Sequence, residues 1–301
     1  MVIHRHSIAI LLAACAAPAL FGCADTRVDR LHYEEIASRS EGRNLRYAVY
    51  EPPGWDRRTP LPLVVMLGGA GNDGKSADPK AVTDRLDRAI TQGRLPPLLM
   101  VMLDGDSGPW TDWYDGGRGS RSWVVDEIIP AVWKSHPVVG GPAGLHILGT
   151  STGGSGALQI WLWDPVRFGS ATIISAPISA ATGTRIFRGP DMTPELMARV
   201  FGPAGSAKDS DPFTRLVSSE SLHGSRLLFG TAEHDPGAVI DSNVAFAAHL
   251  TQARVPHRYV RFAGGDTWKA WAPMIEYALC QQLQPKCPMP DPKGWDVRTV
   301  N

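Results

Sequence analysis

The feature that most constrains this chain is a short glycine-rich turn near its middle. Residues 146–158 read HILGTSTGGSGAL, an apolar run followed directly by a run of small residues. The motif Gly149-Thr150-Ser151-Thr152-Gly153 therefore lies between an expected strand and an expected helix, which is the setting of a G-x-S-x-G elbow. Such a turn is so sharp that a Cβ at either flanking position would meet the neighbouring strand or helix. The sequence thus predicts a strand–turn–helix unit that holds one serine hydroxyl clear of a sheet.

This turn would give Ser151 the surroundings of a nucleophile. Thr152 begins the expected helix, so its backbone N–H would point at an oxyanion formed on a substrate beside Ser151. The plain alternative is a glycine-rich turn after a buried strand, because short motifs also arise by chance. The apolar run before the turn and the helix start after it favour the elbow.

Strand-like and helix-like segments alternate along most of the chain. Strand patterns are expected at residues 45–51, 63–67, 98–103, 171–174, 227–229 and 257–262. Helices are expected at residues 121–135, 241–252, where Asp241 would be the N-cap, and 268–281. This alternation predicts an α/β fold with a mostly parallel sheet and helices on both faces. Ligands bind at the carboxyl ends of the strands in such sheets, and the glycine-rich breaks of this chain fall there.

Length and charge limit the possible functions. The 301 residues allow one large α/β domain or two small ones. Thirty basic side chains balance thirty acidic ones, so the chain has no basic excess that would indicate a nucleic-acid partner. No metal-binding or nucleotide-binding motif occurs, and no cofactor is expected. Residues 179–225 are rich in Gly, Pro, Asp and Ser, and contain one amphipathic helix near residues 194–201. They predict a lid-like insertion beside the site or, alternatively, a surface excursion.

The N-terminus is typical of an export signal. Basic residues precede an apolar stretch at residues 8–21, which ends Leu20-Phe21-Gly22-Cys23. This ending resembles a bacterial lipobox, in which the cysteine is acylated. The sequence therefore predicts a signal peptide over residues 1–22 and a mature domain over residues 23–301. A lipid on Cys23 would anchor that domain in the bacterial cell envelope. Plain secretion after cleavage near Ala24 is the alternative.

Two cysteines remain in the mature domain, Cys280 and Cys287. In an oxidising compartment their short separation makes a disulfide plausible, joining the last helix to the C-terminal tail. Two independent thiols are the alternative, because bonding depends on the distance between the Cα atoms.

Several stretches together resemble the esterase branch of the α/β-hydrolases, which includes S-formylglutathione hydrolases, feruloyl esterases and mycolyltransferases. They are residues 47–54 (YAVYEPPG), 63–71, 111–114 (TDWY), 127–130 (EIIP), 230–233 (GTAE) and 264–268 (GGDTW). The resemblance extends from about residue 31 to residue 279. It implies an α/β-hydrolase fold, a small ester or acyl substrate and oxyanion donors near Gly69 and Ala70. It also implies an acid on the loop that carries Glu233.

One departure from the family pattern concerns the catalytic base. Family members read Gly-Gly-His on the loop at residues 264–266, but this chain has Asp266 there. A serine hydroxyl needs a base whose pKa lies near the working pH, and an ordinary aspartate, with a pKa of about 3.9, is a much weaker base than histidine. Asp266 therefore puts efficient turnover in question.

His234 offers a substitute for the missing histidine. It lies in Glu233-His234-Asp235, on the expected acid loop, as if histidine and carboxylate had exchanged loops. The resulting triad would be Ser151 as nucleophile, His234 as base, and Asp266 or Glu233 to orient the imidazole. A solvated loop histidine is the alternative.

Trp110, Trp113 and Tyr114 cluster after the strand expected at residues 98–103. They would line the substrate site with an aromatic wall or, alternatively, only pack their loop onto the domain.

Two functions remain from the sequence. The first is a cell-envelope serine esterase or acyltransferase that uses Ser151. The second is a degenerate α/β-hydrolase-fold lipoprotein that binds a ligand or serves a structural role. The elbow favours the first function and Asp266 favours the second.

Overall fold

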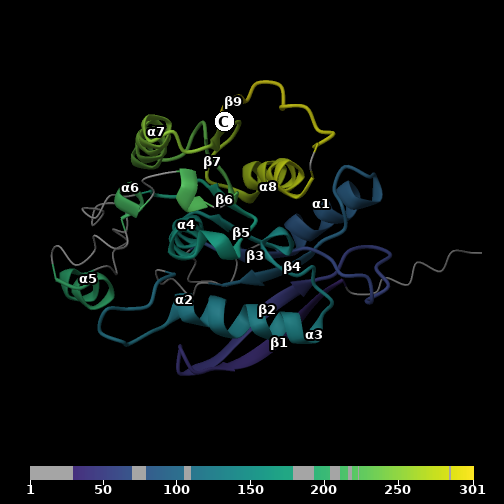
Figure 1. The fold of residues 1–301 in the computed structure, drawn as a ribbon, viewed down its shortest axis with the longest axis horizontal. Coiled ribbons are helices and arrows are strands. Elements are labelled where there is room, and N and C mark those ends of the chain that lie inside the picture. The colour runs from purple at the N-terminus through teal and green to yellow at the C-terminus, as the bar shows by residue number, and fades with distance from the viewer. Residues whose placement is uncertain are drawn as a thin grey trace, which may run out of the picture.

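The computed structural model describes residues 30–69, 79–104, 110–178, 193–203, 211–215, 219–222, 224–284 and 286–301. Within these residues the chain forms a nine-stranded sheet flanked by helices (Figure 1). The strands are β1 (Leu31–Ser38), β2 (Arg43–Tyr50), β3 (Leu63–Leu67), β4 (Leu99–Leu103), β5 (Leu145–Thr150), β6 (Ser170–Ile174), β7 (Arg226–Ala232), β8 (His257–Phe262) and β9 (Asp296–Val300).

The central strands of the sheet are parallel. The strand order is β1-β2-β4-β3-β5-β6-β7-β8-β9, and the six strands from β4 to β8 run in one direction. β2 runs antiparallel to β4, β1 to β2, and β9 to β8. The predicted mostly parallel α/β architecture is confirmed. Because all six parallel strands end at the same edge, the loops after β3, β5, β7 and β8 converge there.

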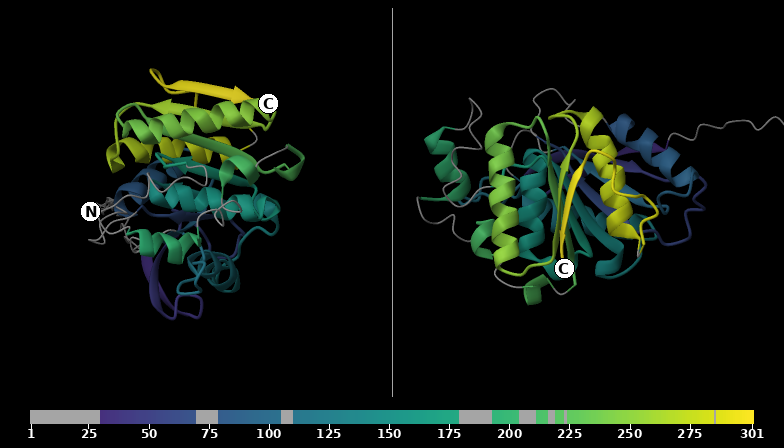
Figure 2. Two further views of the ribbon diagram at one scale, coloured as in Figure 1. Left: turned by 90° about the vertical axis from the view of Figure 1, so that its left-hand side faces the viewer. Right: turned by 90° about the horizontal axis from the view of Figure 1, so that it is seen from above.

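Helices cover both faces of the sheet, as the view along its edge in Figure 2 shows. One face carries α1 (Pro79–Thr91) and α8 (Trp268–Leu283), which contact each other. The other face carries α2 (Ser120–Ser122), α3 (Ile129–Ser135), α4 (Thr152–Trp163) and α7 (Gly237–Gln252). A π-helical stretch, Trp123–Ile128, joins α2 to α3 into one helical segment.

Each face has its own apolar core. Met274 and Tyr277 are fully buried between α8 and the sheet, and Trp161 and Phe246 are fully buried on the opposite face. Replacing a buried aromatic side chain of this kind with alanine costs about 3–5 kcal/mol, so both cores hold the strand ends in place.

Among the elements of the described residues, β1, β9, α1 and the short helix α6 (Pro212–Arg215) were not expected from the sequence. The helix expected at residues 241–252 begins earlier, at Gly237 after Pro236, so the expectation of an N-cap at Asp241 is wrong. Pro236 explains the difference, because proline has no N–H to lose and favours the start of a helix.

Cys280 and Cys287 form a disulfide with a Cα–Cα distance of 5.2 Å, which joins α8 to the C-terminal tail. Cys280 is fully buried.

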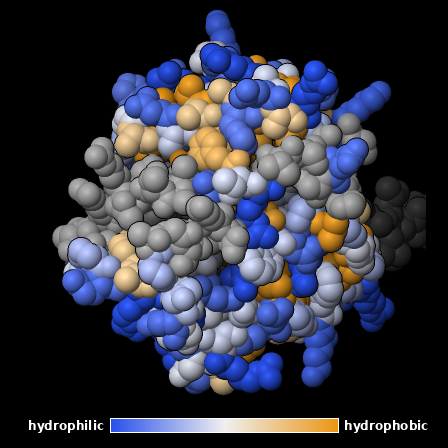
Figure 3. Space-filling view, turned by 60° about the vertical axis from the view of Figure 1, so that its left-hand side comes forward, coloured by the Kyte–Doolittle hydropathy of each residue, from blue (hydrophilic) through white to orange (hydrophobic). Residues whose placement is uncertain are grey.

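Much of the segment expected to form a lid lies outside the described residues, as does Cys23 with the whole expected signal peptide. The described parts of that segment include α5 (Pro194–Phe201), which matches the expected amphipathic helix, and α6 (Pro212–Arg215). None of the helices in the described residues is both long and apolar enough to cross a bilayer. On the face shown in Figure 3, the described surface is a mixture of hydrophilic residues and separate hydrophobic patches, as is ordinary for a folded domain.

Candidate active site

Ser151 lies in the sharp turn between β5 and α4. Its backbone has φ 53° and ψ −128°, a conformation that side-chain-bearing residues rarely adopt and that costs about 1–3 kcal/mol. The turn is held by the backbone, since the Ser151 N–H donates to the Ile174 carbonyl at 2.9 Å. Strain of this kind persists where the surrounding structure enforces it, which is common at functional sites.

The glycines on either side of Ser151 are required by close backbone contacts. A Cβ on Gly149 would lie 2.1 Å from the Gly153 carbonyl oxygen. A Cβ on Gly153 would lie 2.3 Å from the carbonyl oxygens of Leu67 and Gly68. Both distances are far below van der Waals contact, so the sharp turn is compatible only with glycine at these two positions.

The loop after β3 lies directly beside the serine. A Cβ built on Gly69 would be 3.1 Å from Ser151 Cβ and 3.6 Å from Ser151 Oγ. Thr152 is the first residue of α4, so its N–H belongs to the positive end of that helix. Gly69 and Thr152 thus border the same hydroxyl, as an oxyanion site requires, whereas Ala70 lies outside the described residues.

The loop after β7 supplies a buried carboxyl group that the sequence reasoning passed over. Glu233, the expected acid, is exposed, whereas Asp235 is 6 % exposed. Asp235 Oδ2 accepts the Ala232 N–H at 2.7 Å. Asp235 Oδ1 is buried and makes no hydrogen bond of good geometry among the described residues. The buried carboxyl group of this loop is therefore that of Asp235, the next acidic residue in Glu233-His234-Asp235, and not that of Glu233.

Asp235 and Asp266 interact as like charges. Burial raises the pKa of Asp235, the Ser175 hydroxyl and the Ala232 N–H oppose that rise, and the negative charge of Asp266 adds to it. Asp266 lies on the loop after β8 and is exposed to solvent. The protein atoms around its carboxyl group still remove part of its hydration, which raises its pKa. The loops after β7 and β8 therefore bring two carboxyl groups together where a triad would pair a carboxylate with an imidazole.

His234 is exposed and folds back onto the loop after β8. Its backbone N–H donates to the Gly264 carbonyl at 2.9 Å, and its Nδ1 lies 3.0 Å from the same oxygen. A carbonyl can only accept, so Nδ1 carries the proton and Nε2 is the acceptor of the neutral ring. Among the described residues, neither Glu233 nor Asp266 orients this imidazole as the exchanged triad expected. Instead, the hydrogen bond from the His234 N–H to the Gly264 carbonyl holds the ring next to that carbonyl group.

Ser175 and Trp271 brace the two carboxyl-bearing loops. Ser175, directly after β6, also has a positive φ of 49°, and its N–H donates to the Gly230 carbonyl. Its Oγ accepts the Trp271 indole N–H at 3.0 Å. Since Trp271 lies in α8, this hydrogen bond joins the end of β6 to the helix that follows Asp266.

The three aromatic residues lie in different environments. Trp110 is buried, donates its indole N–H to the Gly68 carbonyl at 3.1 Å and stacks on Trp123. Trp113 contacts the guanidinium groups of Arg118 and Arg199, whereas Tyr114 is 66 % exposed. Only Trp110 touches the loop beside Ser151, so a continuous wall of all three is not formed by the described residues.

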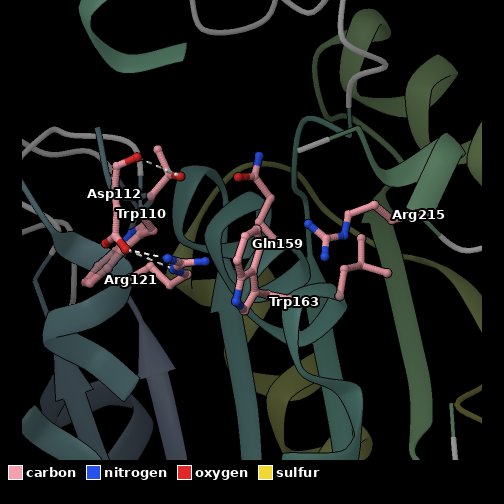
Figure 4. A pocket seen from close by; sticks show the side chains of 8 residues that line it. Trp110, Asp112, Arg121, Gln159, Trp163 and Arg215 are labelled. Atoms are coloured by element: carbon pink, nitrogen blue, oxygen red, sulfur yellow. Dashed lines mark hydrogen bonds and ion pairs between the residues drawn. The ribbon is translucent and has the colours of Figure 1, made fainter. Parts of the chain in front are cut away.

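A cavity of about 140 Å³ opens beside α4 (Figure 4). Trp163 lies in it with the guanidinium carbons of Arg121 and Arg215 at 3.9 and 4.5 Å from its ring centre. Arg121 is neutralised by Asp112, which it meets at 2.6 Å. The cavity is lined by Trp110, Thr111, Asp112, Arg121, Gln159, Leu162, Trp163 and Arg215.

A sequence comparison agrees with this arrangement of the elbow, the neighbouring glycine loop and the four converging strand ends. The model of the esterase family, described as "Putative esterase", matches residues 38–280. The chain belongs to this family. Among curated proteins, none matches the sequence significantly.

Solved structures show the same fold. The fluorophosphonate-binding serine hydrolase FphF of Staphylococcus aureus has 17 % identity and a TM-score of 0.70, covering 84 % of this chain and 98 % of that one. An S-formylglutathione hydrolase from Agrobacterium tumefaciens has 16 % identity and a TM-score of 0.68, covering 84 % and 94 %. A ferulic acid esterase has 18 % identity and a TM-score of 0.69, covering 83 % and 95 %. The esterase branch of the α/β-hydrolases, expected from the sequence, is confirmed.

Proposed function

We propose that this esterase-family chain hydrolyses carboxylic esters with Ser151 as its nucleophile. The observation that carries the proposal is the strained turn at φ 53°, which the glycines on both sides and the Ile174 carbonyl maintain. A structure that no longer used this hydroxyl would gain stability by relaxing the turn. The names of two structural neighbours, a ferulic acid esterase and an S-formylglutathione hydrolase, point to an ester and a thioester as their substrates, and a carboxylic ester is the substrate class we assign.

The reaction follows the usual two steps of acyl transfer. Ser151 Oγ attacks the ester carbonyl while its proton passes to a base, and the oxyanion forms near the Thr152 N–H and the Gly69 loop. The intermediate collapses, the C–O bond to the alcohol breaks, and the alkoxide takes the proton from the base. Water then attacks the acyl-enzyme by the same route and releases the acid.

Asp266 is the proton acceptor that we propose. It lies on the loop from which the family's base comes, close enough to the buried Asp235 for the two carboxyl charges to interact. The raised pKa of Asp266 makes it a stronger base than an aspartate of ordinary pKa. Because a carboxylate is ordinarily a weaker base than an imidazole, we expect slow turnover that increases as the pH rises through the Asp266 pKa.

His234 is the competing acceptor. The Gly264 carbonyl accepts the proton of Nδ1, so Nε2 is the ring nitrogen that would take the serine proton. In this alternative mechanism the Gly264 carbonyl would orient the imidazole, as the acid of a triad does. The His234→Ala variant distinguishes the two, because activity that survives it removes His234 from the mechanism.

A second candidate function is ligand binding without turnover. The observation that favours it is the like-charge pair of Asp235 and Asp266, with one buried oxygen lacking a good partner, at the place where an imidazole would satisfy both. A chain that lost its base would keep the fold and bind a ligand at this site without turning it over.

The N-terminal sequence supports a cell-envelope location for either function. We propose that residues 1–22 are removed and that Cys23 carries the lipid anchor, with soluble secretion as the competing outcome. Labelling with a radioactive or alkyne fatty acid tests this, since the Cys23→Ala variant loses the label only if Cys23 is acylated.

A fluorophosphonate probe tests the nucleophile. We expect it to label the wild type and the Ser135→Ala control, but not Ser151→Ala, because only an activated serine reacts. Ser135 is a suitable control because it lies at the end of α3, away from the converging strand ends. An unlabelled but folded wild type would favour the binding function, and equal labelling of both variants would exclude Ser151.

A further inference from the structure

Two histidines and one glutamate lie close together beside the edge strand β1, away from Ser151. His32 and Glu34 lie on β1, and His136 directly follows α3. One ligand atom from each residue lies within 4.8 Å of the other two. The cluster belongs to no part of the candidate active site, because His32 pairs with Val49 near the start of β1, whereas Ser151 follows the end of β5.

The strand geometry places two of these side chains together by necessity. Alternate residues of a strand point to the same face, so His32 and Glu34 share the face on which the α3 segment lies. His32 Nε2 is 3.4 Å from Glu34 Oε1. Two ligands of a tetrahedral zinc ion, each about 2.0–2.1 Å from the metal, are separated by about 3.4 Å, so this pair already has the required spacing.

The atoms of these side chains that face away from the cluster are held by hydrogen bonds. The Tyr47 hydroxyl donates to Glu34 Oε2 at 2.5 Å, leaving Oε1 toward His32. Ser135 Oγ is 2.8 Å from His136 Nδ1, leaving Nε2 toward Glu51, whose Oε1 lies 3.8 Å away. Outer hydrogen bonds of this type fix the tautomer and the orientation of metal ligands.

The local charge favours a cation. Glu34 and Glu51 contribute two carboxylates, and Arg57, which pairs with Glu51 Oε2, compensates for one of them. The imidazoles of His32 and His136 each offer one ring nitrogen as a metal ligand. His136 is little exposed, with 9 % of its side chain accessible, whereas His32 and Glu34 are about one-third exposed, so an ion could reach the cluster from solvent.

We propose that His32, Glu34 and His136 form a binding site for a zinc ion. A His₂Glu set is a ligand combination that zinc accepts, and a fourth position is available to water or to Glu51. Closing the widest 4.8 Å separation to the tetrahedral value requires a shift of about 1.4 Å, which the two partly exposed side chains of β1 can make. The ion would join edge strand β1 to the end of α3 and serve stability rather than ester hydrolysis.

Zinc binding to the purified full chain tests the site. After treatment with a chelator, the unfolding midpoint is measured with and without Zn²⁺, and the dissociation constant is measured by calorimetry. We expect the midpoint of the wild type to rise by about 5–10 °C at a zinc concentration about 100 times the dissociation constant. Cobalt in place of zinc should give the visible absorption spectrum of a four-coordinate site.

Glu34→Gln and Glu35→Gln form a matched pair for this test. The two residues are neighbours on β1, but the Glu35 side chain is exposed and contacts Asn44 instead of the cluster. Glu34→Gln and His136→Asn should weaken zinc binding at least about tenfold, whereas Glu35→Gln should bind as the wild type does. Unfolding midpoints measured without zinc show whether each variant still folds.

Two results would overturn the proposal. One is a folded wild type that gains no stability and binds no zinc. The other is equal binding by the wild type, Glu34→Gln and His136→Asn, which would place the ion on other groups of the chain.

Discussion

Replacing Asp266 with histidine should increase ester hydrolysis by the largest factor of any single change at this site. A histidine there would place a base of pKa about 6.5 on the loop after β8 instead of a carboxylate. General-base catalysis contributes about 10²–10⁴-fold, which corresponds to about 2.7–5.4 kcal/mol in the activation barrier. Part of this factor is already supplied by wild-type Asp266, whose pKa is raised, so we expect a gain of about 10²-fold in kcat/KM.

The structure also provides the partner that such a histidine needs. Asp235 Oδ1 is buried without a good hydrogen bond and could accept the Nδ1–H of the new imidazole. Satisfying a buried acceptor and removing a like charge should together stabilise the fold by about 1–3 kcal/mol at neutral pH. Activity and stability should therefore rise together in this variant, which is unusual for a change at an active site.

The assay is the hydrolysis of short-chain nitrophenyl esters across a pH series, accompanied by urea unfolding. Asp266→Asn is the matched control, because it removes the charge without supplying a base and should lower activity below that of the wild type. Adding Asp235→Asn to Asp266→His should abolish most of the gain. A folded Asp266→His variant with wild-type activity would refute the reasoning, because Asp235 and the new base would then not act on Ser151.

Three further predictions concern stability. Replacing both Cys280 and Cys287 with alanine removes the disulfide and should lower the free energy of unfolding by about 2.4 kcal/mol, because the bond closes a loop with a sequence separation of 7 residues. Urea titration measures this loss, with the reduced wild type for comparison. Gly153→Ala should cost about 3 kcal/mol in thermal unfolding, and a neutral result would contradict the close contacts at the elbow. The pKa of Asp235 is raised in the folded state, so the free energy of unfolding of the wild type falls as the pH rises from the pKa of the unfolded chain, about 3.9, through the pKa of the folded protein. Relative to the wild type, Asp235→Asn should therefore be more stable at about pH 7 than at about pH 4. A difference in stability that does not depend on pH would argue against the raised pKa.

The strands of the parallel sheet could be predicted because they are short apolar runs with clear ends. β3 and β8 have the expected bounds, and β4 and β6 differ by one residue. The strands at the two edges of the sheet were missed for a physical reason. β1 and β9 are exposed on part of their surface and contain charged residues, so they lack the continuous apolar pattern of a buried strand.

The glycine motif located the elbow at Ser151, but the acid could not be chosen from sequence. Glu233 and Asp235 are two residues apart on one loop, and burial alone distinguishes them. The partner of His234 was also beyond sequence reasoning, because the contact to Gly264 joins loops thirty residues apart. The zinc cluster depends on a pairing of β1 with a distant helix end, and no spacing in the sequence indicates it.

The direction of β1 has a consequence for how substrate would reach the enzyme. Because β1 is antiparallel to β2, and β2 to β4, the first described residues of the domain leave the sheet at the edge opposite Ser151. A domain tethered to a bilayer through its N-terminus would therefore direct the edge of the sheet that carries Ser151 away from the membrane, toward the aqueous phase. That orientation suits esters that arrive by diffusion better than acyl chains embedded in the anchoring membrane.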